Sequence, residues 1–298
     1  MLPAIPSFES ANRSLALIGN YHDVLVQVPL AGGVVYLNDT DQYAHLGATS
    51  HDGNLAVLLT DAKPMVVHAT KGSSGKTEED FRISVGNSGN TRITITRRFF
   101  GADYGLRKKF FTELPPEERN RYYQQVVASV SQGARPVGAL MTRFDGYPGV
   151  ESFTVDVNAY AIRDGNYLYF DLPADLRLFP TATDLRAQPF YLPRPVVRII
   201  RSEVTFPSKD WHILIAPKSR DVAAADGSGR VIVDAREQPG GIAIEHRLSI
   251  DPSIVQATDY PALVRLENSL EDESARAIVV DTGAAAPAPQ PATKAKTP

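Results

Sequence analysis

The chain has 298 residues, with 31 lysines and arginines against 34 aspartates and glutamates, so its formal net charge is −3. This balance disfavours a nucleic-acid-binding protein, which usually carries a basic excess. The sequence contains no cysteine, which excludes disulfides, thiolate zinc sites and a cysteine nucleophile within this chain.

The first seventy residues predict two pairs of short strands. Apolar and polar residues alternate through Tyr21–Val28, a glycine-containing turn follows, and the run 34–37 returns as a second strand. Residues 54–60 and 64–69 predict two more strands. The polar, glycine-rich segment 71–76 is typical of a linker or a long loop.

A longer hairpin and one helix are predicted next. Alternation through 81–85 and 93–95 flanks the turn sequence Asn-Ser-Gly-Asn at 87–90. The basic and aromatic residues of 107–111 are interpreted as a strand with a wet face and a buried face. Proline and two glutamates then begin a helix at about 115–131, because both residue types favour a first helical turn.

The remainder of the sequence predicts mostly strands. Short strands separated by turn residues fill 135–250, which is typical of a β-sandwich or of antiparallel layers. The aromatic residues of 167–170 are expected in the core. A second helix is predicted from about Asp259, with leucines on one face, and residues 278–280 predict a closing strand. The alanine-, proline- and lysine-rich residues 283–298 are expected to be disordered.

Residues 20–47 carry a more specific pattern. A histidine, His22, opens one predicted strand in the sequence NYHDVLV, and the next predicted strand leads into VYLNDTDQYAHLG. This block resembles the end of the transglutaminase-like core of exported bacterial proteins, in which a β domain precedes the core and another follows it. Residues 78–282 are similar to the following β domain, through the Glu-Glu-Arg helix start, the tyrosine- and proline-rich middle and the Asp-Tyr-Pro-Ala helix start.

The resemblance implies a remnant of a catalytic triad. In the family, a histidine and an aspartate on adjacent strands act with a cysteine on an upstream helix. The matching positions here are His22 and Asn38, and Asp39 is expected to face the opposite side. An asparagine can orient a neutral imidazole but does not stabilise an imidazolium as a carboxylate does. On pattern alone, His22 is an ordinary strand histidine.

We therefore expect a mainly β fold, with antiparallel sheets or a β-sandwich and two short helices, preceded by a partial transglutaminase-like β core. The predicted divisions are the core remnant at 1–70, a linker at 71–80, a β domain at 81–282 and a tail at 283–298.

Two main functions remain open, beside a truncated product with no function of its own. The first is a non-catalytic binding or scaffold region of a transglutaminase-like protein, with a protein or peptide as its ligand. The second is the back half of a thiol acyltransferase or cysteine peptidase. Its cysteine would lie on an upstream segment or a separate polypeptide, and His22 would be the general base. A core without its cysteine helix would expose apolar surface, so self-association is expected.

No cofactor or metal is predicted. The acidic and histidine residues between 22 and 52 lack the spacing of known metal motifs, and Gly72–Thr77 lacks the first glycine of a phosphate loop. No apolar run approaches the roughly 20 residues of a membrane-spanning helix. The first residues also lack the pattern of a secretory signal, so a periplasmic or other extracytoplasmic location follows only from the resemblance.

Overall fold

The computed structural model describes residues 2–3, 23–31, 33–37, 42–177, 185–192, 195–224, 227, 229–251 and 253–283. Within them the fold is mainly β, as the sequence predicts, and the sheets are antiparallel except for one parallel contact, which makes the largest sheet a mixed one. Two of the three α-helices are the predicted ones.

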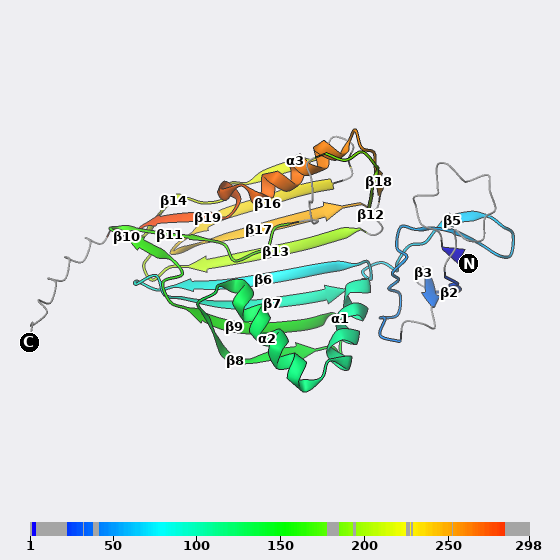
Figure 1. Ribbon diagram of the computed structural model, residues 1–298, viewed down its shortest axis with the longest axis horizontal. Helices are drawn as coiled ribbons and strands as arrows, with labels where there is room; N and C mark the ends of the chain where they lie inside the picture. Colours follow the sequence, from blue (N-terminus) through cyan, green and yellow to red (C-terminus); the bar gives the residue numbers. More distant parts are fainter. Residues whose placement is uncertain are drawn as a thin grey trace, which may run out of the picture.

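The dominant element is an eight-stranded sheet with the order β15-β16-β17-β13-β6-β7-β9-β8 (Figure 1). Its strands are β6 (Lys76–Val85), β7 (Thr91–Phe100), β8 (Ala134–Arg143), β9 (Gly149–Val157), β13 (Val196–Thr205), β15 (Arg220–Ala223), β16 (Gly229–Gln238) and β17 (Gly241–Ile250). All neighbours are antiparallel except β13 and β6, which run parallel. The sheet therefore consists of two antiparallel four-stranded halves joined by one parallel contact.

Helices cover the half made of β6, β7, β9 and β8, called here the helix-covered half. Between β7 and β8 the chain forms α1 (Gly101–Glu113) and α2 (Pro116–Val130), which contact β6–β9. The bounds of α2 confirm the helix predicted at 115–131.

The strand expected at 107–111 is wrong, because these residues belong to α1. Gly101 has a φ of 56°, and a Cβ there would lie 2.5 Å from the backbone of Ser74 and Gly75, so glycine permits the sharp exit from β7. The helix buries Tyr104 and Phe111 on its inner side, two helical turns apart.

A small sheet and a helix cover the half made of β13, β17, β16 and β15, called here the sheet-covered half. The small sheet has the order β10-β11-β19-β14, with β10 (Ile162–Asp164), β11 (Tyr167–Asp171), β14 (His212–Ile215) and β19 (Ala277–Asp281). Helix α3 (Tyr260–Glu271) lies beside it, followed by the 3-10 helix η3 (Glu273–Ala275), and β12 (Phe190–Leu192) pairs with β18 (Ser253–Val255). The predictions of a helix from Asp259 and of a closing strand at 278–280 are confirmed.

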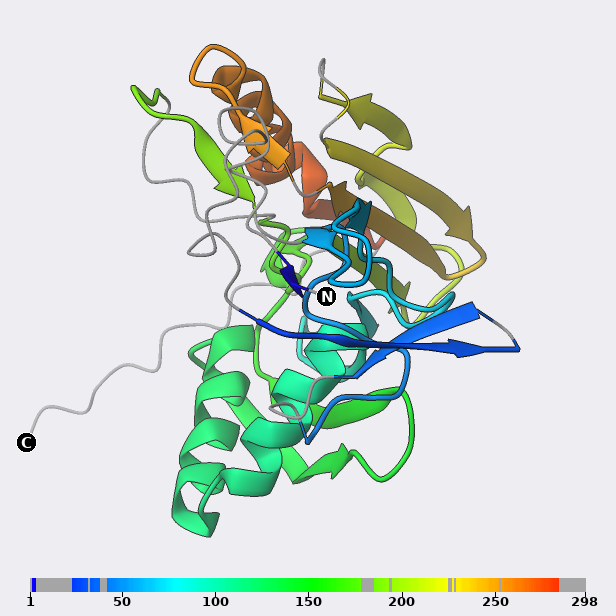
Figure 2. The same cartoon turned by 90° about the vertical axis from the view of Figure 1, so that its right-hand side faces the viewer.

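One apolar core lies between the inner face of the large sheet and the two covers. It joins Ile95 of β7, Val127 of α2, Phe170 of β11, Ile200 of β13 and Leu266 of α3, among others. Figure 2 shows α2 and α3 on the same side of the sheet. Both halves therefore bury the same face.

The opposite, outer face of the large sheet is polar. Arg92 donates two hydrogen bonds of 2.7 Å to Asp156, and Thr94 lies 3.0 Å from Thr154, oxygen to oxygen. These residues alternate with core residues along β7 and β9, as expected for an antiparallel sheet with one face in water.

The N-terminal strands form separate small sheets beyond the end of the large one (Figure 1). They are β1 (Leu2–Pro3), β4 (Leu55–Val57) and β5 (Pro64–Val66) in one sheet, and β2 (Val26–Leu30) and β3 (Gly33–Leu37) in the other. Among the described residues of this region, the core cluster contains four buried side chains, Leu25, Tyr36, Ala56 and Val67. The hairpin predicted from the alternation at 21–37 is present, whereas β4 and β5 are shorter than predicted.

The linker predicted at 71–80 is too long. Strand β6 begins at Lys76, which pairs with β7, and residues 77–80 pair with both β7 and β13. The sequence Lys-Thr-Glu-Glu-Asp lacks the apolar alternation that predicts a strand, because its charged side chains form ion pairs instead of packing in an apolar core.

Candidate functional site: a charged groove between two covers

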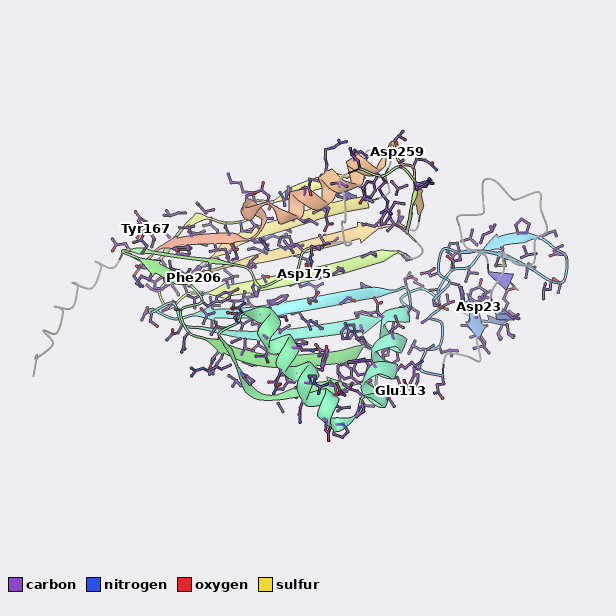
Figure 3. The ribbon with its side chains drawn as sticks, in the orientation of Figure 1. Asp23, Glu113, Tyr167, Asp175, Phe206 and Asp259 are labelled. Carbon is purple, nitrogen blue, oxygen red and sulfur yellow. The ribbon has the colours of Figure 1, made fainter. Side chains whose placement is uncertain are left out.

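The two covers leave a groove over the inner face of β6 and β13. Two hollows of about 760 and 610 Å³ open there, and both are lined by Glu79, Arg97 and Asp175. Figure 3 labels Asp175 near the middle of the molecule, between α2 and α3. The groove thus lies where the helix-covered and sheet-covered halves meet.

A chain of charged side chains forms the floor of the groove. Arg198 of β13 donates to Glu79 Oε1 at 2.7 Å, and Arg97 of β7 donates through Nε to Glu79 Oε2 at 3.1 Å. Arg97 also donates through Nη1 to Glu151 Oε1 of β9 at 2.9 Å. Tyr122 of α2 completes the chain with a bond of 2.6 Å to Glu151 Oε2. Four strands and a helix are therefore joined by one network, called here the floor network.

The members of the floor network are held in defined charge states. The Glu151 side chain has no exposed surface, and buried ions persist only where partners satisfy them. Burial opposes the charge of Arg97, but Glu79 and Glu151 outweigh it, and the pKa of Arg97 is raised. Burial and the neighbouring Glu151 raise the pKa of Tyr122 far above its ordinary value, so its hydroxyl remains a donor.

Ion pairs also connect the two halves on the outer face. Arg201 of β13 donates to Glu245 of β17 at 2.8 Å and to Glu78 of β6 at 3.1 Å, and it lies 3.4 Å from Asp80. Arg98 of β7 in turn donates to Asp80. The parallel contact between β13 and β6 is therefore held by arginine–carboxylate pairs on both faces.

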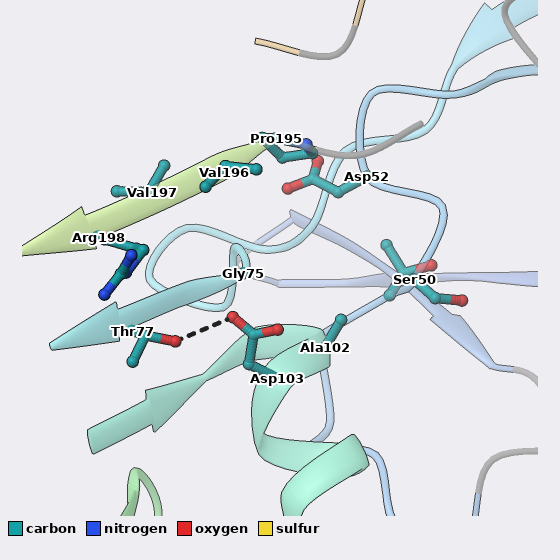
Figure 4. Close-up of a pocket in the computed structure, with 11 residues that line it drawn as sticks. Ser50, Asp52, Gly75, Thr77, Ala102, Asp103, Pro195, Val196, Val197 and Arg198 are labelled. Carbon is teal, nitrogen blue, oxygen red and sulfur yellow. Dashed lines mark hydrogen bonds between the residues drawn. The ribbon is translucent and has the colours of Figure 1, made fainter. Parts of the chain in front are cut away.

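A smaller pocket of about 210 Å³ extends the groove toward the N-terminal strands (Figure 4). Its wall includes Ser50 and Asp52 from the N-terminal segment, and the Thr77 hydroxyl lies 3.3 Å from Asp103 Oδ2 of α1. Thr77, Asp103 and Arg198 line both this pocket and the 610 Å³ hollow. The three cavities therefore form one elongated series.

An aromatic contact fixes the N-terminal segment beside this pocket. The ring of His45 stacks on Tyr147 with centroids 3.8 Å apart, and the Tyr147 hydroxyl donates to the carbonyl oxygen of Gly72 at 3.2 Å. The same hydroxyl accepts a hydrogen bond from the Gly101 amide at 3.0 Å. One tyrosine thus connects the N-terminal segment, the start of α1 and the loop before β9.

The residues proposed as a triad remnant, His22 and Asn38, lie outside the described residues. The neighbouring Asp23 is described, and its carboxylate lies 3.4 Å from His51 Nε2. Burial lowers the pKa of His51, and Asp23 partly opposes this effect. The roles assigned to His22 and Asn38 remain predictions.

The aromatic residues of 167–170 divide between two faces. Phe170 is buried in the core, as expected, whereas Tyr167 and Tyr169 are 47% and 44% exposed on the outer face of the small sheet. The expectation that all three pack in the core is therefore wrong. The alternation of β11 in a sheet with one wet face explains the difference.

The described part of the chain contains neither a candidate metal site nor a candidate membrane-spanning helix. None of its clusters of histidine, aspartate or glutamate has three or more members placed to hold a metal ion. Among the same residues, no helix is long and apolar enough to cross a membrane.

Comparison with known proteins adds one finding. The model of a family described as "Domain of Unknown Function with solved-structure structure (DUF3858)" matches residues 166–280, less than half of the chain. The matched segment contains every strand of the sheet-covered half, most of the small sheet and α3. Neither a curated protein nor a solved structure matches the chain. The helix-covered half lies outside the matched segment.

Proposed function

We propose that this chain is a non-catalytic binding or scaffold region of a transglutaminase-like protein and that its groove holds an extended peptide. The groove is the observation that carries the proposal. Its three cavities follow one another and share lining residues, which suits an elongated ligand better than a compact one.

The groove walls offer both kinds of contact that an extended peptide needs. Leu106 and Phe110 of α1 and Val130 of α2 provide apolar surface, whereas Asn158 and Arg177 provide polar groups. Binding sites combine such apolar walls with a few fixed polar groups. The floor network satisfies its own members, so it supplies a rigid base rather than a mobile one.

The non-catalytic part of the proposal rests on chemistry. The transglutaminase-like resemblance requires a thiol nucleophile, and the chain has none. An extracytoplasmic location and a bacterial source belong to the same proposal, since both come with the resemblance.

A groove-filling variant tests the proposal. We would measure binding of the full chain to an array of random nonapeptides, and then compare Ser129→Trp with Arg82→Trp. Ser129 is exposed at the groove wall on α2, whereas Arg82 is exposed on the outer face of β6. Binding that is lost only in Ser129→Trp supports the proposal. Binding that survives Ser129→Trp, or no binding by the full chain, overturns it.

An activity assay tests the alternative of a split enzyme. The chain would be mixed with a labelled amine and a glutamine-containing peptide, alone and with the in-frame polypeptide encoded directly upstream. The proposal predicts no amine transfer in either mixture. Amine transfer would support the hypothesis of a split thiol enzyme instead if it required a cysteine of the upstream polypeptide and was lost in His22→Ala.

A further inference from the structure

The groove contains more arginines than its carboxylates engage. Glu79 is shared by Arg97 and Arg198, and Asp175 pairs with Arg177 at 2.8 Å. Two further arginines line the hollows, Arg107 and Arg276. Among the described residues, neither of these two has a carboxylate within ion-pair distance. The hollows also contain the carboxylates of Asp103 and Asp171, but neither forms an ion pair with Arg107 or Arg276, so the groove presents two arginines that no described carboxylate engages directly.

Of these two arginines, Arg276 has a buried hydrogen-bond donor that lacks an acceptor among the described residues. It precedes β19 and lines the 760 Å³ hollow, and its carbonyl oxygen accepts a hydrogen bond of 3.0 Å from the Leu172 amide, which fixes the backbone. Its Nε atom is buried and has no hydrogen-bond partner in the described part of the chain. An unsatisfied buried donor costs about 1–3 kcal/mol, and more when it is charged. Because that Nε atom is enclosed, an incoming acceptor would bind the partly exposed end of the same guanidinium, which lines the hollow.

Arg107 occupies the other hollow. It projects from α1 into the 610 Å³ hollow, and its guanidinium lies 5.1 Å from the centre of the Phe99 ring. A ring face holds a guanidinium while leaving its N–H edge available for an oxygen acceptor. Glu79, Arg97 and Asp175 line both hollows, and each hollow also contains one of these two arginines.

We infer that the groove selects an acidic peptide, with one carboxylate side chain bound by Arg107 and another by Arg276. This inference rests on the proposed function, because it assumes that the groove is the binding site. Arginine suits this role because its planar fork can donate two parallel hydrogen bonds to one carboxylate. Apolar residues between the acidic positions would contact Phe110, Val130 and Leu172 along the walls.

A matched set of peptides provides the probe. Three labelled nonapeptides share the same alanine and valine positions and differ only at their polar positions, which carry glutamate, glutamine or lysine. Fluorescence anisotropy with the full chain measures each dissociation constant. The glutamate peptide is expected to bind at least about tenfold more tightly than the glutamine peptide, and added salt should reduce the difference.

Single substitutions connect the preference to the two arginines. Arg276→Gln and Arg107→Gln keep a long polar side chain and should each weaken glutamate-peptide binding by about tenfold, with the glutamine peptide little changed. Arg236→Gln is the control, because Arg236 lies on the outer face with its side chain 78% exposed. Thermal unfolding of each variant verifies that the fold is retained.

The possible failures are distinguishable. If all three peptides bind equally and Ser129→Trp abolishes their binding, the groove is a peptide site but the acidic preference is wrong. If the glutamate peptide binds best but neither arginine substitution weakens it, the assignment of these two anchors is wrong. If none of the three peptides binds although members of the random array do, only the acidic preference is wrong; if the array does not bind either, the proposed function fails together with the inference.

Discussion

The two halves of the large sheet bury polar groups in different ways. In the helix-covered half, the buried Glu151 is ionisable and receives bonds from Arg97 and Tyr122. In the sheet-covered half, the buried strand residue is His246, with Ile200 and Val233 as its register partners and Arg220 nearby. The buried carboxylate of this half, Glu267, lies on α3 and not on a strand of the large sheet. Burial lowers the pKa of His246 to about 4, so it is neutral at pH 7.

This difference explains where the groove lies. Ionised side chains remain buried only with partners and access to some water, whereas a neutral imidazole can be enclosed. The floor network reaches the surface through Glu79 and Arg198, which are 11% and 19% exposed, and it leaves an opening between the covers. The sheet-covered half closes completely over its histidine. The groove therefore lies at the boundary between the halves.

Removing a buried charge should have the largest effect. Glu151→Ala leaves Arg97 with one fewer carboxylate in a buried site, which should lower the free energy of unfolding by about 3–5 kcal/mol. Chemical denaturation measures this loss. Asp156→Ala on the outer face of the same strand should cost at most about 1 kcal/mol, because its pair with Arg92 is exposed. Equal losses for the two variants would contradict the account.

Acid should destabilise the fold through the buried His246. Because the folded pKa of His246 lies below its ordinary 6.5, its contribution to stability is complete above pH 6.5 and is lost as the pH falls through about 4. The full effect is about 3 kcal/mol. Denaturation of wild type and His246→Leu at a series of pH values should show a flatter acid dependence in the variant.

An exposed histidine provides the control for the acid experiment. His212 lies on the edge strand β14 and is exposed, so His212→Gln should retain the wild-type dependence on pH. A His246→Leu variant whose stability falls with acid as steeply as that of wild type would show that this histidine is not the responsible group.

Removal of the single hydroxyl that contacts Glu151 should have a smaller effect on stability. Tyr122→Phe removes one donor to the buried carboxylate of Glu151, and a hydrogen bond to a charged group is worth about 1.5–3 kcal/mol. The neighbouring Tyr123 donates to the carbonyl oxygen of Gly138 at an exposed site, so Tyr123→Phe should cost less than about 1 kcal/mol. Thermal unfolding of both variants gives the order, and a reversed order would argue against the floor network.

The N-terminal strands should affect association more than stability. Val26 and Leu37 are register partners on β2 and β3 and are 59% and 45% exposed. The chain should therefore self-associate or bind an apolar dye, and Val26→Thr with Leu37→Thr should reduce this with little change in unfolding. Deletion of residues 1–70 should abolish it. Leu214→Thr, at another exposed site, is the control.

Local patterns in the sequence predicted much of the fold. The hairpin of β6 and β7, the helices α2 and α3 and the strand β19 all follow from alternation, turn residues or helix-start residues. Helix α1 was missed because its basic and aromatic residues also fit a strand and because its start depends on Gly101, whose close contact with residues 74–75 is tertiary. The parallel contact of β13 with β6 joins segments about 120 residues apart, and no local pattern specifies it.

The candidate site was less accessible to sequence reasoning. Glu79, Arg97, Glu151 and Arg198 lie on four strands, and each looks like an ordinary polar position in its own segment. A usable signal was present, because each occupies the position in its strand where alternation predicts an inward-facing residue. An ionisable residue at such a position predicts a buried partner but does not identify it.

Hydrogen exchange of the full chain, with and without saturating glutamate nonapeptide, tests most directly whether the opening between the two covers is the binding surface. Peptide binding in the groove should slow exchange at the groove walls, in residues 128–133 and 172–177, with no change on the outer face of β7 and β9. Unchanged exchange at those walls, or protection on the exposed face of the small sheet around Tyr167 and Tyr169 instead, would contradict this expectation.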